Sequence, residues 1–181
     1  MHIPPRQPLG QHRAFDIEYL LFCQKKAENR ECSWSFRSVM GLPLPSWQRP
    51  YEWDEVQQQR FIESIYLDLY HGVYVLNAAD YEGPDGSPKK FSNALLDGQQ
   101  RITTIEKYLN DEFEVFGALW SELTKGEQRR FLNSPFHCME VSIWDEDKLR
   151  ELSDRLAFGG TAHKDEYRAS LGYNYQQEDR K

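Results

Sequence analysis

Ten residues near the middle of the chain read Leu95-Leu96-Asp97-Gly98-Gln99-Gln100-Arg101-Ile102-Thr103-Thr104. The apolar start predicts a short buried strand over 94–96, and the residues from 99 to about 110 predict a helix. Between them Gly98 has no Cβ, so the backbone can turn tightly and a ligand can come close. The free amides of the first helical turn form a site for an anion. A second interpretation stays open, in which Asp-Gly is a turn and Gln-Gln-Arg a solvated helix start.

The side chains around Gly98 suit a phosphorylated ligand. Arg101 can place its planar guanidinium on two phosphate oxygens. Asp97 is a carboxylate that can hold a metal ion or orient a water molecule. Gln99 and Gln100 each offer a donor and an acceptor to a ribose, a base or a bound water. No Gly-Lys-Ser/Thr follows, so the stretch is not a Walker A loop.

A second stretch upstream reads Leu42-Pro43-Leu44-Pro45-Ser46-Trp47-Gln48-Arg49-Pro50-Tyr51-Glu52-Trp53-Asp54. Prolines stiffen the backbone on both sides of Gln48 and Arg49, and Trp47, Tyr51 and Trp53 supply three aromatic faces. Stiff backbone, stacking surface and one arginine suit a nucleotide or a nucleic-acid strand. The alternative is a Pro-rich turn whose aromatic rings pack into the core.

A third stretch lies downstream, where a helix expected over about 145–157 runs into Gly159 and Gly160. A glycine pair before a further helix can let backbone amides face a ligand. His163 follows the pair and is a candidate for the wall of the same site. The alternative is an ordinary corner between two helices.

Length and charge restrict the possible partners. The chain has 181 residues and a formal net charge of −7. Residues 1–49 carry seven basic and four acidic side chains, whereas residues 50–144 carry eight and sixteen. Weak, salt-dependent DNA binding is therefore expected through the N-terminal basic third. The cations expected to carry it are Arg6, Arg13, Lys25, Lys26 and Arg37.

The cellular setting is predicted from what the sequence lacks. Three cysteines without a Cys-x-x-Cys pair indicate neither a disulfide framework nor a zinc cluster, which fits the reducing cytosol. The longest apolar run, at 19–23, is far shorter than the roughly 20 residues of a membrane span. No secretory signal is visible at the start of the chain. We expect a cytoplasmic protein with no membrane partner.

Hydrophobic periodicity and turn residues predict one α+β domain over residues 1–181. We expect a core over about 40–170, an N-terminal helical extension and a frayed tail. The expected helices cover 15–30, 55–70 with Asp54 as N-cap and Gly72 as stop, 99–110, 119–132 and 145–157. The expected strands cover 35–40, 73–76, 94–96 and 137–144, and 80–92 is expected to be a polar loop.

Together the three stretches resemble the ParB/sulfiredoxin-like domains related to GmrSD-type restriction enzymes, whose hallmark is Asp-Gly-Gln-Gln-Arg. Residues 96–104 match the hallmark with its hydroxyl-rich continuation, which includes Thr103. Residues 42–53 resemble the upstream Gln-Arg-Pro-Tyr-x-Trp element, and residues 155–163 resemble Arg-Leu-Asn-Phe-Gly-Gly-Thr-x-His. One departure is visible, because the asparagine of that last element falls at Ala157.

The resemblance implies a ParB/sulfiredoxin-like fold, a small mixed sheet with surrounding helices, and a nucleotide pocket. It implies a nucleoside-triphosphate hydrolase, with DNA-cleaving or DNA-directed activity in conflicts among plasmids, phages and hosts. The alternative is a non-catalytic module of the same fold that binds a nucleotide or a partner protein. Mg²⁺ and a nucleoside triphosphate, with ATP as the default, are the expected cofactors.

The expected roles divide the candidate residues into two groups. The catalytic group has Asp97 orienting metal or water, with Arg101 and Gln100 beside it. The nucleotide-binding group consists of Gln48, Arg49, Gly98, Gln99, Thr103, Gly159, Gly160 and His163.

Overall fold

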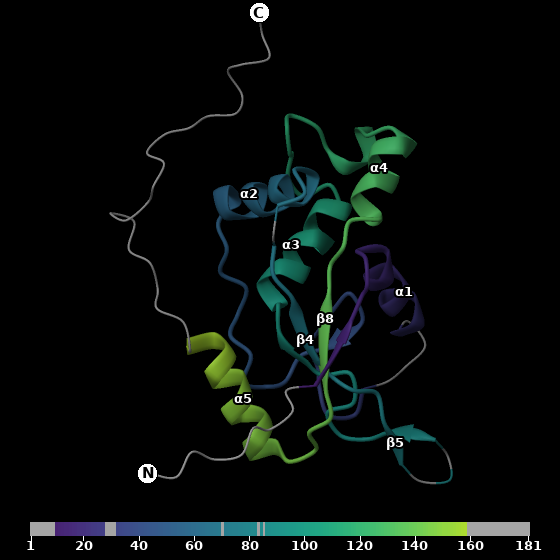
Figure 1. The fold of residues 1–181 in the computed structure, drawn as a ribbon, viewed down its shortest axis with the longest axis vertical. Helices are drawn as coiled ribbons and strands as arrows, with labels where there is room; N and C mark the ends of the chain where they lie inside the picture. The colour runs from purple at the N-terminus through teal and green to yellow at the C-terminus, as the bar shows by residue number, and fades with distance from the viewer. Residues whose placement is uncertain (1–9, 28–31, 70, 83, 85, 159–181) are drawn as a thin grey trace, which may run out of the picture.

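The computed structural model describes residues 10–27, 32–69, 71–82, 84 and 86–158. Within these residues five α-helices and one short 3₁₀ helix (η1) surround small β-sheets (Figure 1). In chain order the elements are β1 (Gln11–Arg13), α1 (Glu18–Ala27), β2 (Ser38–Val39), β3 (Leu42–Pro43), α2 (Glu55–Tyr66), β4 (Tyr74–Asn77), β5 (Tyr81–Glu82), β6 (Ser87–Pro88), β7 (Leu95–Asp97), α3 (Gln99–Leu109), η1 (Trp120–Glu122), α4 (Lys125–Leu132), β8 (Cys138–Val141) and α5 (Glu146–Phe158).

The central sheet has four strands in the order β1-β8-β4-β7. β4 runs parallel to β8, with Tyr74 opposite Cys138 and Asn77 opposite Val141. β1 pairs antiparallel with β8, and β7 pairs antiparallel with β4. All four residues of β4 are buried, because this strand has neighbours on both edges and packed layers on both faces. The mixed α/β architecture expected from the sequence is confirmed.

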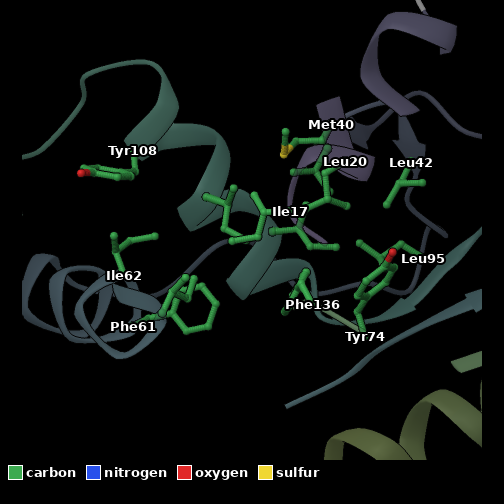
Figure 2. Packing of buried hydrophobic residues seen from close by; sticks show 14 of the residues in the cluster. Ile17, Leu20, Met40, Leu42, Phe61, Ile62, Tyr74, Leu95, Tyr108 and Phe136 are labelled. Carbon is green, nitrogen blue, oxygen red and sulfur yellow. The ribbon is translucent and has the colours of Figure 1, made fainter. Parts of the chain in front are cut away.

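The alternation of β4 side chains divides the core into two clusters. Tyr74 and Leu76 join the larger cluster with residues of α1 to α4. Figure 2 shows part of this cluster, with Tyr74 of β4, Leu20 of α1 and Ile62 of α2 labelled. Val75 points to the opposite face, where it joins the smaller cluster with Leu149 of α5 and other residues. The sheet therefore lies between α5 on one face and the other helices on the opposite face. This arrangement leaves the end of β7 and the start of α3 next to α5.

Helix α2 begins where the sequence predicts and ends earlier. Asp54 accepts a hydrogen bond from the Gln57 amide at 2.8 Å, and the Gln57 side chain accepts one from the Asp54 amide at 3.0 Å. This capping box confirms Asp54 as the N-cap. The helix ends at Tyr66, so the prediction that it extends to residue 70 and is stopped by Gly72 was wrong. Asp68 adopts a positive φ of 57°, which breaks the helical path four residues before the glycine.

The helix expected over 119–132 is two separate elements. Leu123 is extended (φ −70°, ψ 147°), which ends the 3₁₀ turn of η1. Thr124 then caps α4 by accepting a hydrogen bond from the Glu127 amide. A Thr-x-x-Glu capping box is a start signal that hydrophobic spacing alone does not reveal.

Residues 10–27 contribute one strand to the sheet and two buried side chains to the core. β1 adds a strand to the sheet that the sequence did not predict, and it is exposed along its length. Leu20 of α1 and Ile17 just before it are fully buried in the larger cluster. The region expected to be a polar loop over 80–92 also contains a short hairpin of β5 and β6. Across the described part of the chain, no helix has the length and apolar content that crossing a membrane requires.

Candidate functional site

A cavity of about 300 Å³ brings the sequence stretches together. Its lining includes Trp47 and Arg49 from the Pro-rich stretch, Asp97 to Arg101 from the end of β7 and the start of α3, and Ala157 from α5. These segments are far apart in the sequence, and the layers of the fold place them side by side. Gly159, Gly160 and His163 lie outside the described residues.

Gly98 connects β7 to α3 in a conformation that a side chain would oppose. Its φ is 103°, and an added Cβ would lie 2.6 Å from the Cβ of Tyr74. No side chain caps the helix at this position, so the first amides of α3 are free of such a partner. Backbone N–H groups and the helix dipole at an uncapped start favour an anion. The cavity therefore opens onto an end of α3 whose charge favours an anion.

Arg101 and Asp97 form an ion pair across the first turn of α3. Arg101 Nη2 donates to Asp97 Oδ2 at 2.7 Å, and Arg101 Nη1 donates to the His71 carbonyl at 3.2 Å. The guanidinium lies against Gly72, where any Cβ would collide with Nη1. The arginine side chain is 17% exposed and the carboxylate 38%. Arg101 thus fixes the orientation of Asp97, whose Oδ1 has no hydrogen-bond partner among the described residues.

Gln100 and Gln48 hold the Pro-rich stretch against the sheet. Gln100 Oε1 accepts hydrogen bonds from the amides of Glu52 at 2.8 Å and Trp53 at 3.3 Å. Its Nε2 donates to the Pro50 carbonyl at 2.9 Å. Gln48 Nε2 donates to the Leu96 carbonyl at 2.7 Å. Both carboxamides are engaged by the backbone, so the structure gives them a positioning role in the site.

Gln99 differs from its neighbour. The residue lines the cavity and is 7% exposed. Its Oε1 is buried and has no hydrogen-bond partner within the described part of the chain. Because a buried polar atom without a partner is costly and uncommon, this oxygen is a candidate acceptor for a ligand.

Helix α5 forms the far wall through side chains to which the sequence assigned no role. Trp47 Nε1 donates to Ser153 Oγ at 3.1 Å, and the guanidinium of Arg150 lies 4.3 Å from the centroid of the Trp47 ring. Asp154 lies on the cavity lining beside Ser153. In the sequence, Asp154 is marked only by its position one helical turn before Ala157. Thr103, in contrast, lies on α3 outside the described lining of the cavity.

The charges of the cavity balance. Arg49 and Arg101 contribute two positive charges, and Asp97 and Asp154 contribute two negative ones. Arg49 pairs with Glu52 at 3.1 Å, but both side chains are more than half exposed, so the pair is weak and a ligand can replace it. A highly charged anion would need an additional cation to bind here.

The described residues contain no cluster of three or more His, Cys, Asp or Glu side chains suited to a metal ion. This excludes, within those residues, a metal cage built from protein ligands alone.

The basic side chains expected to bind DNA have different surroundings. Arg13 pairs with Glu140 at 2.8 Å. Arg37 donates to the carbonyls of Pro45 and Gln48, so it supports the turn before Arg49. Lys25 and Lys26 are exposed on α1, and no carboxylate of the described residues forms an ion pair with either. Arg6 lies outside the described residues.

A comparison with models of known protein families matches residues 34–180 to the GmrSD restriction endonuclease, N-terminal domain. The match covers all three stretches that line or approach the cavity. No curated protein and no solved structure matches the chain.

Proposed function

Because this chain belongs to the family of GmrSD restriction endonuclease N-terminal domains, we propose that it is a nucleoside-triphosphate hydrolase with a DNA-directed role. The family concerns restriction of DNA, which supports a hydrolase that acts on or near DNA. Hydrolysis of the nucleotide is the finer part of the proposal and is argued from the cavity. We also propose that the fold is of the ParB/sulfiredoxin-like type and that the protein acts in the cytoplasm, in conflicts among plasmids, phages and hosts.

One observation carries the assignment of a nucleotide to this cavity. The Gln99 oxygen, which has no hydrogen-bond partner among the described residues, is buried at the uncapped start of α3, and Asp97 and Arg101 line the same cavity. The free amides and the arginines suit phosphate oxygens, and the Gln99 carbonyl oxygen suits an N–H or O–H donor of the base or ribose. A nucleoside phosphate offers both kinds of group on one molecule.

The charge balance supports Mg²⁺ as part of the bound ligand. A triphosphate adds several negative charges to a cavity whose own charged side chains sum to zero. Asp97 Oδ1 has no hydrogen-bond partner among the described residues, and Asp154 is a second carboxylate on the lining. Both would hold the ion, which would neutralise charge on the phosphates and polarise them when bound.

The side chains divide the hydrolytic step among themselves. A water molecule attacks the γ-phosphorus, the bond to the β–γ bridging oxygen breaks, and the products are a nucleoside diphosphate and inorganic phosphate. Asp97 Oδ1 orients that water, and the proton of the water passes to a phosphate oxygen. Arg101 acts through Asp97 by holding its Oδ2, and Arg49 leaves Glu52 to bind the phosphates. Gln48 and Gln100 keep the Pro-rich wall in place.

A second candidate function is a binding module that does not hydrolyse its nucleotide. Ala157 lines the cavity where the related motif has asparagine, so a methyl group replaces a carboxamide at the site. If that amide is needed in the transition state, the cavity binds a nucleotide without turnover.

Phosphate release tests the proposal. Wild-type protein is incubated with each of the four ribonucleoside triphosphates, with and without Mg²⁺ and with and without DNA. We expect Mg²⁺-dependent release of phosphate from at least one of them. Calorimetric binding without release would support the binding module instead. The absence of both binding and release would contradict a nucleotide site.

A further inference from the structure

A second cavity of about 390 Å³ lies on the side of the molecule that carries α1 and the β5–β6 hairpin, away from α5 (Figure 1). It shares no lining residue with the cavity at α3. We propose that it takes a nucleobase that carries a phosphate, presented as an unstacked base of a DNA strand. The choice of a strand as the source rests on the proposed DNA-directed role.

Aromatic side chains form the walls of this cavity. Phe22 of α1 is 56% exposed and lies 5.9 Å, between ring centroids, from Tyr19, which stacks in turn on Phe15 at 3.7 Å. Trp34 also lines the cavity, and its ring lies edge-on against buried Phe91, with centroids 5.3 Å apart. Flat rings that are fixed by their neighbours are a suitable surface for a base to stack on. The volume lies in the range usual for small-ligand pockets.

A free carboxamide faces the same space. Asn93 lines the cavity, is partly exposed, and has no side-chain hydrogen bond to any other described residue. An amide offers one acceptor and two donor hydrogens, which match the mixed donors and acceptors along the edge of a base. Neighbouring Ser92 is already engaged by the backbone of Asp80, so it is not available in the same way.

The charge at the cavity favours a phosphate. Lys26 lines it, and its Nζ lies 5.7 Å from the Phe22 centroid. Glu140 also lies on the lining, but Arg13 pairs with it at 2.8 Å and offsets its charge. Among the described lining residues, Lys26 therefore leaves one positive charge without a paired carboxylate beside an exposed ring. A stacked base on Phe22 would place its own phosphate within reach of Lys26.

Fluorescence anisotropy with a labelled short oligothymidylate tests this proposal at low salt. Phe22→Ala and Asn93→Asp are compared with the wild type, because aspartate tolerates the positive φ of residue 93 and removes the donors. Phe36→Ala is the matched aromatic control, since Phe36 is fully exposed and lies off the cavity lining. Lys26→Glu is matched by Lys125→Glu on α4. Thermal midpoints are measured for every variant.

We expect the loss of the Phe22 ring to weaken binding by about 5- to 150-fold, the range for one stacked base. Asn93→Asp and Lys26→Glu should also weaken it, and the two control variants should bind like the wild type. A strand of abasic residues with the same number of phosphates should bind more weakly than oligothymidylate. Free thymidine monophosphate is tested as a second ligand. If it binds, if Phe22→Ala weakens its binding, and if the strand does not bind, the cavity takes a mononucleotide rather than a base of a strand.

Three results would overturn the proposal: variants that bind as the wild type does, equal binding of the abasic strand, or no binding of either ligand. None of them bears on the nucleotide cavity. Phosphate release without DNA is measured separately on the same variants. Phe22→Ala should leave it unchanged, so failure of this inference and failure of the proposed hydrolysis are distinguishable.

Discussion

Gln99 and Gln100 are neighbours in the first turn of α3, yet their carboxamides have opposite surroundings. Gln100 uses its oxygen and its nitrogen to bind the backbone of residues 50–53. Gln99 buries an oxygen that no described residue contacts by a hydrogen bond. The pair therefore separates the two requirements of the site, since one glutamine holds the wall in place and the other is available to a ligand.

We predict that Gln99→Met leaves the fold at least as stable as the wild type. The change removes a buried oxygen whose lack of a partner costs about 1–3 kcal/mol. Each kcal/mol gained would raise Tm by about 2–4 °C for a chain of this size. Nucleotide affinity should fall at the same time. Thermal unfolding and calorimetric titration check both parts, and a less stable variant with unchanged affinity would contradict the role given to Gln99.

Gln100→Ala should have the reverse effect on stability. Two backbone amides and one carbonyl lose their partner, so we expect the free energy of unfolding to fall by about 1–3 kcal/mol. Urea unfolding of this variant beside Gln99→Met measures the contrast between adjacent positions. An unchanged midpoint would mean that water replaces the Gln100 carboxamide without cost.

Much of the fold was predictable from local signals. The strand-turn-helix unit at 95–109, the capping box at Asp54 and the strand at 74–77 each rest on residues close together in the sequence. β1 could not be predicted, because Gln11, His12 and Arg13 are polar and exposed, and only pairing with β8 makes them a strand. The end of α2 was also missed, because the break comes from a left-handed Asp68 rather than from the glycine.

The sequence indicated which segments line the cavity, but it did not indicate which role each side chain has there. The motif stretches identified the residues that line the cavity from β7, α3 and the Pro-rich segment. Which glutamine faces the backbone and which faces the cavity depends on the position of residues 50–53, about 50 residues away in the sequence. Asp154 and Ser153 were missed for a similar reason, since only the packing of α5 against Trp47 places them there.

Ala157→Asn tests the departure from the related motif. Ala157 and Asp97 lie on the lining of the same cavity, so a carboxamide at 157 can reach a bound phosphate or water. One hydrogen bond to a charged group is worth about 1.5–3 kcal/mol. If it forms mainly in the transition state, phosphate release should be about 10- to 150-fold faster. Equal rates for the two proteins, measured with and without Mg²⁺, would mean that position 157 has no catalytic part.

The attachment of α5 should weaken in acid. Glu146 accepts hydrogen bonds from Lys90 at 2.9 Å and from Arg150 at 2.8 Å, and these bonds lower the pKa of its carboxyl from the ordinary 4.5. The unfolded chain therefore takes up this proton at a higher pH than the folded one does. The stabilisation is present above about pH 4.5 and is lost as the pH falls through the lowered pKa.

Urea unfolding of the wild type and Glu146→Gln across this pH range measures the effect. The difference in stability should be largest near neutral pH and should shrink in acid. Glu151→Gln is the control on the same helix, because among the described residues Glu151 pairs only with the exposed Arg155. If the difference in stability between the wild type and Glu146→Gln stayed constant down to pH 3, the two ion pairs of Glu146 would not be its cause.

The most direct test of nucleotide hydrolysis at the start of α3 is the rate of phosphate release by Asp97→Asn. Asparagine can keep the hydrogen bond to Arg101 while the charge that orients water and metal is removed. A positioned carboxylate typically accelerates such a reaction by about 100- to 10,000-fold. The rate of phosphate release should therefore fall by that factor in Asp97→Asn, while nucleotide binding and Tm are retained. Asp147→Asn, an exposed position of α5 outside the cavity lining, should match the wild type. Release by Asp97→Asn at the wild-type rate would contradict the account.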